Sequence, residues 1–328
     1  MTTSPFAFAR PLRIVIPGGS GQIGQLLARY FQERGHYVTV LTRGPHTAQW
    51  QTVHWDGQHP GLWTQYLEGI DVCINLTGRS VNCRYTPENR EAIYNSRIQS
   101  TRVLGEVIAG LAEPPRVWLN ASTATIYRHA LDREMDENTG ELGGNEPNAP
   151  DAWNFSIRVA KDWEAAFFAA PTPHTRKVAM RSAITFSPKP GSAFAVFSNL
   201  VRVGLGGKQG NGRQFVSWIH EADFASAVEF LIGHDDMSGP VNIASPNPLP
   251  NREFMADLRE AWGVPNGFPA PTPLLELGAF FLRTETELVL KSRRVVPGRL
   301  LNAGFRFQFP FWPHAAEDLV DQWRHRDD

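Results

Sequence analysis

The chain has 328 residues, of which 42% are hydrophobic and 20% charged, so we expect a packed globular protein and exclude wholesale disorder. The formal net charge is −1, which gives no electrostatic reason to expect nucleic acid or an acidic membrane surface as a partner. Two cysteines cannot build a disulfide framework, and this predicts a reducing, cytoplasmic environment.

The N-terminal segment 1–10 has neither a basic region nor a long apolar core, so it does not resemble a secretion signal. We interpret it as a flexible extension. The folded part of the chain is therefore expected to begin near residue 11.

The stretch from Ile14 to Arg43 predicts a β-α-β unit. An apolar run at 14–16 leads into a glycine turn at 17–24, an amphipathic helix follows, and a second apolar run occupies 37–41. Gly18 permits a sharp turn at positive φ, Gly21 a close approach of phosphate, and Gly24 close packing of helix on strand. The helix N-terminus adds free N–H groups and a partial positive charge. We therefore predict a dinucleotide pyrophosphate site at Gly18, Gly19, Ser20, Gly21, Gln22, Ile23 and Gly24.

The end of the second predicted strand favours NADP(H) as the cofactor. An acidic residue at this place would bind the 2′-hydroxyl of NAD. This chain has Thr42 and Arg43 there instead, and an arginine pairs with a 2′-phosphate through a forked, charge-assisted contact. The alternative is that Arg43 is a solvated surface residue.

Strands and helices continue to alternate up to about residue 187. Buried strands are predicted at 71–76, 116–122 and 177–181, with Cys73 buried in the first, and helices at 87–111 and 155–170. The polar segment 128–151 predicts a long surface loop of the kind that often covers an active site. This alternation favours an α/β fold with a Rossmann-type, doubly wound parallel sheet.

After residue 188, prolines and glycines interrupt the alternation. We predict a short strand at 216–220, a helix at 223–231, a strand at 239–244 and a helix at 251–262. The apolar stretch Leu274–Leu282 contains Glu276 and is too short to span a bilayer. We assign residues 11–187 to an NADP-binding domain, to which 213–245 return in part, and residues 188–328 to a smaller C-terminal α+β lobe on the substrate side.

Several motifs together resemble the extended and atypical short-chain dehydrogenases/reductases of the NAD(P)-dependent epimerase/dehydratase family. The glycine turn and the segments 75–78, 121–127 and 218–223 follow the order of that family. The segments 96–98, 163–164, 204–207, 247–254 and, most specifically, 296–305 resemble its YfcH-like subgroup of sugar-nucleotide epimerase-like proteins. Members of that subgroup end in a short domain of unknown function. The resemblance covers about residues 11–310.

The resemblance implies roles for residues outside the glycine turn. It places Asp56 at the adenine and Thr123 at the reacting oxygen, and it assigns His220 and Asp223 to the junction of the lobes. Along the ribose and nicotinamide it places Leu76, Thr77 and Gly78. It also implies a homodimer through helices near 88–111 and 152–170, and a small-molecule substrate that is anionic or nucleotide-linked. No metal site is predicted.

The chain lacks the proton-transfer pair of this family, a tyrosine four residues before a lysine. The lysine is needed because the unperturbed tyrosine pKa is about 10. When the chain is aligned on Glu164, Ser156 and Ala160 occupy the usual tyrosine and lysine positions. The residues four positions before the five lysines are Ile157, Pro173, Thr185, Gly204 and Glu287, and none is a tyrosine.

The sequence alone does not identify another residue that could take over the role of this pair. Tyr127 is a candidate catalytic residue because it follows the end of a strand, but packing is its alternative role. His129 lies in the polar loop, and Ser156 has no base beside it. Lys161 adjoins the lost lysine position, but helix geometry turns it about 100° away.

Two arginines are candidates for binding an anionic substrate, Arg84 and Arg97, together with Arg79. The alternative for Arg97 is a surface arginine paired with a carboxylate.

Two functions remain open. The first is an NADP(H)-dependent oxidoreductase or epimerase with an atypical proton shuttle, in which Thr123 polarises the substrate carbonyl. The second is a non-catalytic NADPH-binding redox sensor or regulatory protein.

Overall fold

The computed structural model describes residues 8–45, 47–273, 275–276 and 286–325. Most of the predicted extension and most of the apolar stretch 274–282 lie outside these residues. Seven strands form one parallel sheet in the order β10-β6-β5-β4-β1-β2-β3. Their bounds are β1 (Arg13–Pro17), β2 (Tyr37–Thr42), β3 (Gln51–His54), β4 (Val72–Asn75), β5 (Val117–Thr123), β6 (Arg176–Ser182) and β10 (Gly239–Ile243).

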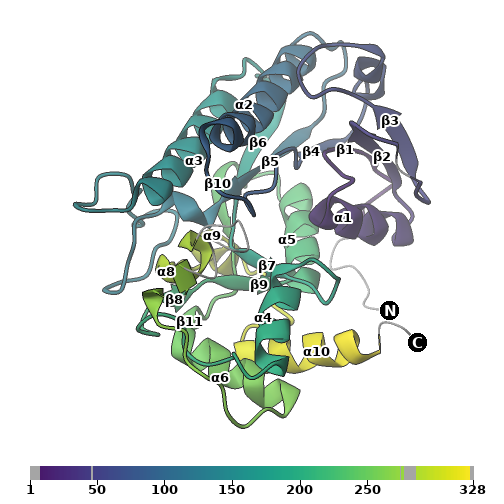
Figure 1. The fold of residues 1–328 in the computed structure, drawn as a ribbon. Helices are drawn as coiled ribbons and strands as arrows, with labels where there is room; N and C mark the ends of the chain where they lie inside the picture. Colours follow the sequence, from purple (N-terminus) through teal and green to yellow (C-terminus); the bar gives the residue numbers. More distant parts are fainter. Residues whose placement is uncertain (1–7, 46, 274, 277–285, 326–328) are drawn as a thin grey trace.

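Helices cover both faces of the sheet (Figure 1). One face holds α2 (Pro87–Ala109) and α3 (Asp151–Ala169), and the other holds α1 (Gln22–Glu33) and α5 (Glu221–Gly233). The alternating direction of strand side chains accounts for both faces being apolar. Ile14 and Ile16 pack with α1 and α5, whereas Val15 packs with the helices opposite. The predicted Rossmann-type fold is confirmed.

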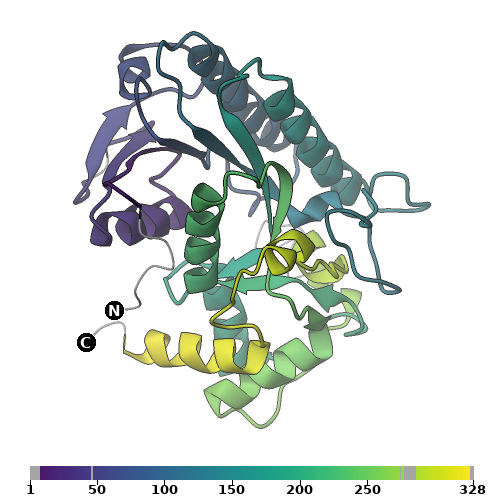
Figure 2. The same cartoon turned by 180° about the vertical axis from the view of Figure 1, so that it is seen from behind.

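A smaller lobe lies beyond the carboxyl ends of the strands, as the view from behind also shows (Figure 2). Aromatic side chains fill its core, and Phe254 and Trp312 stack with ring centroids 4.3 Å apart. Its helices are α4 (Ala193–Arg202), α6 (Asn251–Trp262), α8 (Glu287–Leu290), α9 (Gly298–Asn302) and α10 (Trp312–Arg324). Its short strands are β7 (Ile184–Phe186), β8 (Phe215–Val216), β9 (Trp218–His220) and β11 (Leu249–Pro250).

The structure corrects the sequence analysis mainly in this lobe. Helices α4 and α10 were not predicted, because the glycines and prolines that flank α4 obscured its pattern. The single strand expected at 216–220 is two strands, separated by Ser217. The Ser217 hydroxyl donates to the carbonyl of Arg293 (2.5 Å) and accepts from the amide of Val295 (2.8 Å), so this residue binds the C-terminal segment.

Two side chains at the start of α5 join the lobes. His220, the N-cap of α5, lies 3.0 Å from the carboxylate of Asp318 on α10. Asp223 accepts from the amides of Gln308 and Phe309, while burial raises its pKa. These contacts match the structural role expected for both residues. In the part of the chain that the structure describes, every helix is too short or too polar to cross a bilayer.

A buried polar network ties α3 to the sheet. Glu164 of α3 forms two hydrogen bonds with Arg181 of β6, at 2.7 and 2.8 Å, and also accepts from Ser122 of β5 at 2.6 Å. Arg181 also donates to the Tyr127 hydroxyl, which donates to Asn242 of β10, both at 2.9 Å. Glu164 and Arg181 are only 8% and 6% exposed. Each buried charge is therefore stable only while the opposite charge is present.

We expect Glu164→Gln to lower the free energy of unfolding by about 3–5 kcal/mol, because it leaves the buried Arg181 guanidinium without a counter-charge. Urea denaturation measures this change. Glu141→Gln is the matched control, since Glu141 pairs with Arg128 at a half-exposed site and such pairs contribute about 0–1 kcal/mol. Equal losses in the two variants would contradict the proposed importance of the network.

Candidate functional site

A cavity of about 470 Å³ lies at the carboxyl ends of β4, β5 and β6, beside the start of α1. Ligands of open α/β sheets bind at this edge, because the strand ends and helix N-termini converge there. The cavity takes its lining from both lobes. The lining residues used below are Gln22, Ile23, Leu76, Gly78, Tyr85, Arg97, Thr123, Ser156, Ala160, Trp163 and Glu287.

The glycine turn at the start of α1 has the geometry of a phosphate cradle. Gly18 has φ +75°, and a Cβ there would lie 2.8 Å from the backbone of Thr77. A Cβ at Gly24 would lie 2.3 Å from the Cα of Gly19, so the helix and turn require glycines where they touch. A Cβ at Gly21 would meet only the Gly18 carbonyl, at 3.6 Å. The space beside Gly21 is therefore open to a ligand.

The N-terminus of α1 is available to an anion. Its N-cap, Gly21, provides no side-chain hydrogen bond, and Gln22 and Ile23 line the cavity. The first turn of a helix has unsatisfied N–H groups and a partial positive charge. Nearby, the buried hydroxyl of Thr77 has no hydrogen-bond partner among the described residues. The cradle, the uncapped helix and this hydroxyl fit the phosphates and ribose of a dinucleotide.

Two predicted cofactor residues lie at the edges of this region. Arg43 follows the last residue of β2, is exposed, and makes no ion pair with a described residue. Asp56 accepts from the amides of Gln58 and His59 and lies 2.7 Å from the ring Nδ1 of His59. These hydrogen bonds lower the pKa of Asp56 to about 2. The Asp56 carboxylate therefore stabilises its own turn, whatever it binds besides.

The remaining predicted cofactor and reaction residues sit at neighbouring strand ends. Leu76 and Gly78 follow β4 and line the cavity. Thr123 ends β5 and also lines it. The Thr123 oxygen accepts from the amide of Thr125 at 3.1 Å, so the hydroxyl hydrogen is free to donate to a bound molecule.

Tyr127 does not reach this cavity, so its interpretation as a catalytic candidate needs correction. The residue is 1% exposed and does not belong to the cavity lining. Its hydroxyl is held by Arg181 and Asn242, and burial raises its pKa. Packing within the polar network, the alternative role, matches this position.

The polar loop also lies elsewhere than expected. None of residues 128–150 lines the cavity, so the loop does not cover it. His129 stacks on Trp153, with ring centroids 5.3 Å apart, and accepts from the amide of Ser292. Lys161 extends toward the loop near Gly144, whereas Ala160 faces the cavity. From the C-terminal segment, Glu287 lines the cavity.

The three candidate substrate arginines differ in their position relative to the cavity. Arg97 lines the cavity, lies over Trp163 with its guanidinium carbon 5.1 Å from the ring, and donates to the carbonyls of Arg79 and Ile93. Burial lowers the pKa of Arg97 to about 10, and no described carboxylate pairs with it. Arg84 and Arg79 are not among the lining residues, so only Arg97 of the three faces the cavity.

Three cavity residues were not predicted to act together, namely Tyr85, Ser156 and Glu287. The Ser156 hydroxyl lies 2.5 Å from a carboxylate oxygen of Glu287 and 3.3 Å from the Tyr85 hydroxyl. The base that Ser156 lacked in sequence is thus supplied from 131 residues away. In the sequence, Glu287 was noted only as the residue four positions before Lys291, and this spacing did not connect it with Ser156.

Comparison with known proteins identifies the chain over nearly its full length. Residues 14–244 match the model of the NAD dependent epimerase/dehydratase family, and residues 270–319 match a domain of unknown function, DUF1731. The epimerase family protein SDR39U1 of Bos taurus is 30% identical over 94% of this chain and 100% of its own length. An epimerase family protein of Staphylococcus epidermidis is 29% identical over 94% and 99%.

Solved structures of two similar proteins have the same fold as this chain. A crystal structure of human SDR39U1 with NADPH is 27% identical, with a TM-score of 0.82 over 94% of this chain and 99% of that one. A nucleoside-diphosphate sugar epimerase from Corynebacterium glutamicum is 26% identical, with a TM-score of 0.71 over 95% of this chain and 59% of that one. The resemblance inferred from the motifs is confirmed, and the chain belongs to the NAD-dependent epimerase/dehydratase family.

Proposed function

We propose that the protein is an NADP(H)-dependent oxidoreductase of the epimerase type that acts on a carbonyl or alcohol group of an anionic small molecule. One observation carries this proposal. A single cavity is lined by the open N-terminus of α1, by Thr123 at the end of β5 and by the half-buried Arg97. These are the groups needed to bind a dinucleotide, to hold a reacting oxygen and to bind an anion.

The residues that would hold the cofactor are those of the cradle and the neighbouring strand ends. The turn 18–24 binds the pyrophosphate, Arg43 the 2′-phosphate, and Asp56 the adenine. Leu76, Thr77 and Gly78 lie along the ribose and nicotinamide. When bound, the cofactor donates or accepts a hydride at the nicotinamide ring. Human SDR39U1, crystallised with NADPH, supports this choice of cofactor.

The substrate side follows from Thr123 and Arg97. Thr123 donates its free hydroxyl hydrogen to the substrate oxygen and stabilises charge that develops there. Arg97 attracts an anionic group, because its half-buried side chain lines the cavity and lacks an acidic partner among the described residues. A nucleotide-linked sugar meets both needs, and the similar protein of Corynebacterium glutamicum, described as a nucleoside-diphosphate sugar epimerase, supports this class.

The second candidate is a non-catalytic NADPH-binding sensor. The absence of the family's tyrosine–lysine pair favours it, since Ser156 and Ala160 occupy those positions. Both functions require the cofactor cradle, so cofactor binding alone does not separate them.

Transfer of label separates the two candidates. The protein is incubated with NADPH deuterated stereospecifically at C4 and a panel of carbonyl compounds and nucleotide sugars, and products are analysed by mass spectrometry. We expect deuterium in a product, and a loss of about 10²–10³ in the transfer rate in Thr123→Val, because a donor to the reacting oxygen is removed. Tight NADPH binding without transfer to any compound would favour the sensor.

Cofactor selectivity tests Arg43. Removing one charge-assisted contact costs about 1.5–3 kcal/mol, so Arg43→Ala should lower the NADPH/NADH affinity ratio by about 10-fold or more. Titration calorimetry measures both affinities. The control is Arg213→Ala, an exposed arginine of the smaller lobe. An unchanged ratio in Arg43→Ala would refute the assignment of the 2′-phosphate to this residue.

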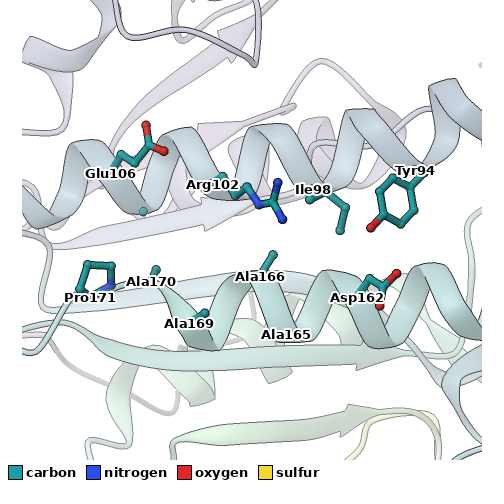
Figure 3. Close-up of a pocket in the computed structure, with 11 residues that line it drawn as sticks. Tyr94, Ile98, Arg102, Glu106, Asp162, Ala165, Ala166, Ala169, Ala170 and Pro171 are labelled. Carbon is teal, nitrogen blue, oxygen red and sulfur yellow. The ribbon is translucent and has the colours of Figure 1, made fainter.

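We further propose a homodimer through the outer surfaces of α2 and α3. A groove of about 470 Å³ runs between these helices, with alanines along α3 and Ile98 and Arg102 on α2 (Figure 3). Small side chains allow two helix pairs to approach closely, as in four-helix packing.

The paired change Ala165→Arg and Ala169→Arg would place two charges in this interface. We expect the sedimentation mass to fall from that of a dimer to that of the 36.6 kDa chain, with thermal stability of the monomer retained. Asn266→Arg, on the smaller lobe, serves as the control. The dimer proposal fails if the wild-type protein sediments as a monomer, or if the paired variant remains a dimer.

A further inference from the structure

Glu287 brings a buried carboxylate into the cavity from the C-terminal segment. It begins α8, is 3% exposed, and lines the cavity opposite the residues of the Rossmann sheet. One of its oxygens pairs with Arg293 at 3.3 Å, and Arg293 is itself 5% exposed. A carboxylate buried in this way is stable only with a counter-charge and hydrogen bonds, and both are present.

The second carboxylate oxygen of Glu287 is bonded to Ser156. Ser156 belongs to α3, lines the same cavity and donates to Oε2 over 2.5 Å. Its position on α3 is where the family has its tyrosine. The cavity therefore holds a hydroxyl at the usual place of proton exchange, hydrogen-bonded to a carboxylate that lies far away in the sequence.

We propose that Ser156 and Glu287 form a proton relay that replaces the missing tyrosine–lysine pair, with Ser156 touching the substrate oxygen and Glu287 storing the proton. This inference rests on the proposed oxidoreductase function and adds the residues that move its proton. It also gives the C-terminal segment a part in the chemistry, since the segment supplies the acid–base group.

The proton balance of the relay is complete in both directions. When an alcohol is oxidised, its carbon loses a hydride to the cofactor and its O–H proton passes to Ser156 Oγ. The proton that Ser156 already held passes along the 2.5 Å hydrogen bond to Glu287 Oε2. When the carbonyl is reduced again, Glu287 returns a proton to Ser156 as Ser156 protonates the substrate oxygen. Over one epimerisation cycle no proton is gained or lost.

The neighbouring ionisable groups are less suited to this task. Burial raises the pKa of Tyr85 to about 12, so at neutral pH its hydroxyl is a poor proton acceptor, and it lies 3.3 Å from the Ser156 hydroxyl. Lys291 is also buried, and burial lowers its pKa to about 7. However, its ammonium donates to the carbonyl of Thr125 at 2.8 Å and does not line the cavity.

The test compares variants in the deuterium-transfer assay described above. Ser156→Ala is the decisive variant, because it breaks the relay but leaves the Glu287–Arg293 pair intact. Glu287→Gln tests the proton-accepting carboxylate itself, but it also removes the counter-charge of the buried Arg293. Glu287→Asp is therefore added, because it keeps the negative charge. Glu134→Gln is the matched control, since Glu134 pairs with Arg294 of the same segment at the surface, 3.4 Å away.

General acid–base groups contribute about 10²–10⁴ to a rate, so we expect transfer to fall by about 100-fold or more in Ser156→Ala and Glu287→Gln. Glu287→Asp should retain part of the rate, and Glu134→Gln all of it. Affinity for NADPH, measured by its fluorescence, should be unchanged in every variant. If the wild-type protein transfers label and Ser156→Ala transfers it equally fast, the relay is wrong and the proposed function stands. If the wild-type protein transfers none, the proposed function fails, and the relay fails with it.

Infrared spectroscopy adds a readout that needs no turnover. A carboxylate stretching band should vanish in Glu287→Gln and shift in Ser156→Ala, because that carboxylate loses a short hydrogen bond. Tyr85→Phe should change the band less than Ser156→Ala does, since the Tyr85 hydroxyl lies 3.3 Å from Ser156 and the Ser156 hydroxyl itself donates to Glu287. A Glu287 band that is identical with and without the Ser156 hydroxyl would overturn the proposed contact.

Discussion

The buried pair of Glu164 and Arg181 is the interaction on which the site depends. It fixes the rotation and height of α3 against β6, and Ser156 lies on the same helix about two turns earlier. Through Tyr127 the same arginine reaches Asn242 on β10, whose amide donates to the carbonyl of Val296 at 2.9 Å. One guanidinium thus aligns the helix and the C-terminal segment that meet in the cavity.

The two halves of the proposed chemistry come from different parts of the chain. The dinucleotide cradle is local, because strand, turn and helix are consecutive and the glycines are required by contacts within the turn. The proton relay is non-local, because Ser156 and Glu287 meet only when the segment after residue 286 docks. Under the proposed chemistry, the chain keeps a local cradle of the family's kind and replaces the tyrosine and lysine with two residues from distant segments.

The sequence predicted the elements β1, α1 and β2 well. Apolar periodicity and glycine spacing located β1, α1 and β2 within a few residues, since each depends on neighbours in the chain. The smaller lobe was predicted less completely, because α4 and α10 are stabilised by aromatic packing between distant segments. Tyr127 was misplaced for a related reason. A strand end predicts that a side chain is near the cavity, but only the positions of Arg181 and Asn242 determine that this tyrosine points into the network.

The C-terminal segment also constrains the order in which the molecule can be completed. Its residues from Ser292 to Val295 hydrogen-bond to Ala130 and Ser217, at sequence separations of 162 and 78 residues. Contacts over such separations form slowly, and chains emerge from the ribosome N-terminus first. A nascent chain therefore exposes the whole nucleotide cradle while the Glu287 carboxylate is still being synthesised. The proposed nucleotide cradle and the proposed acid–base group are thus synthesised at different times, so a partly made chain has the residues to hold a nucleotide before it has those to move a proton.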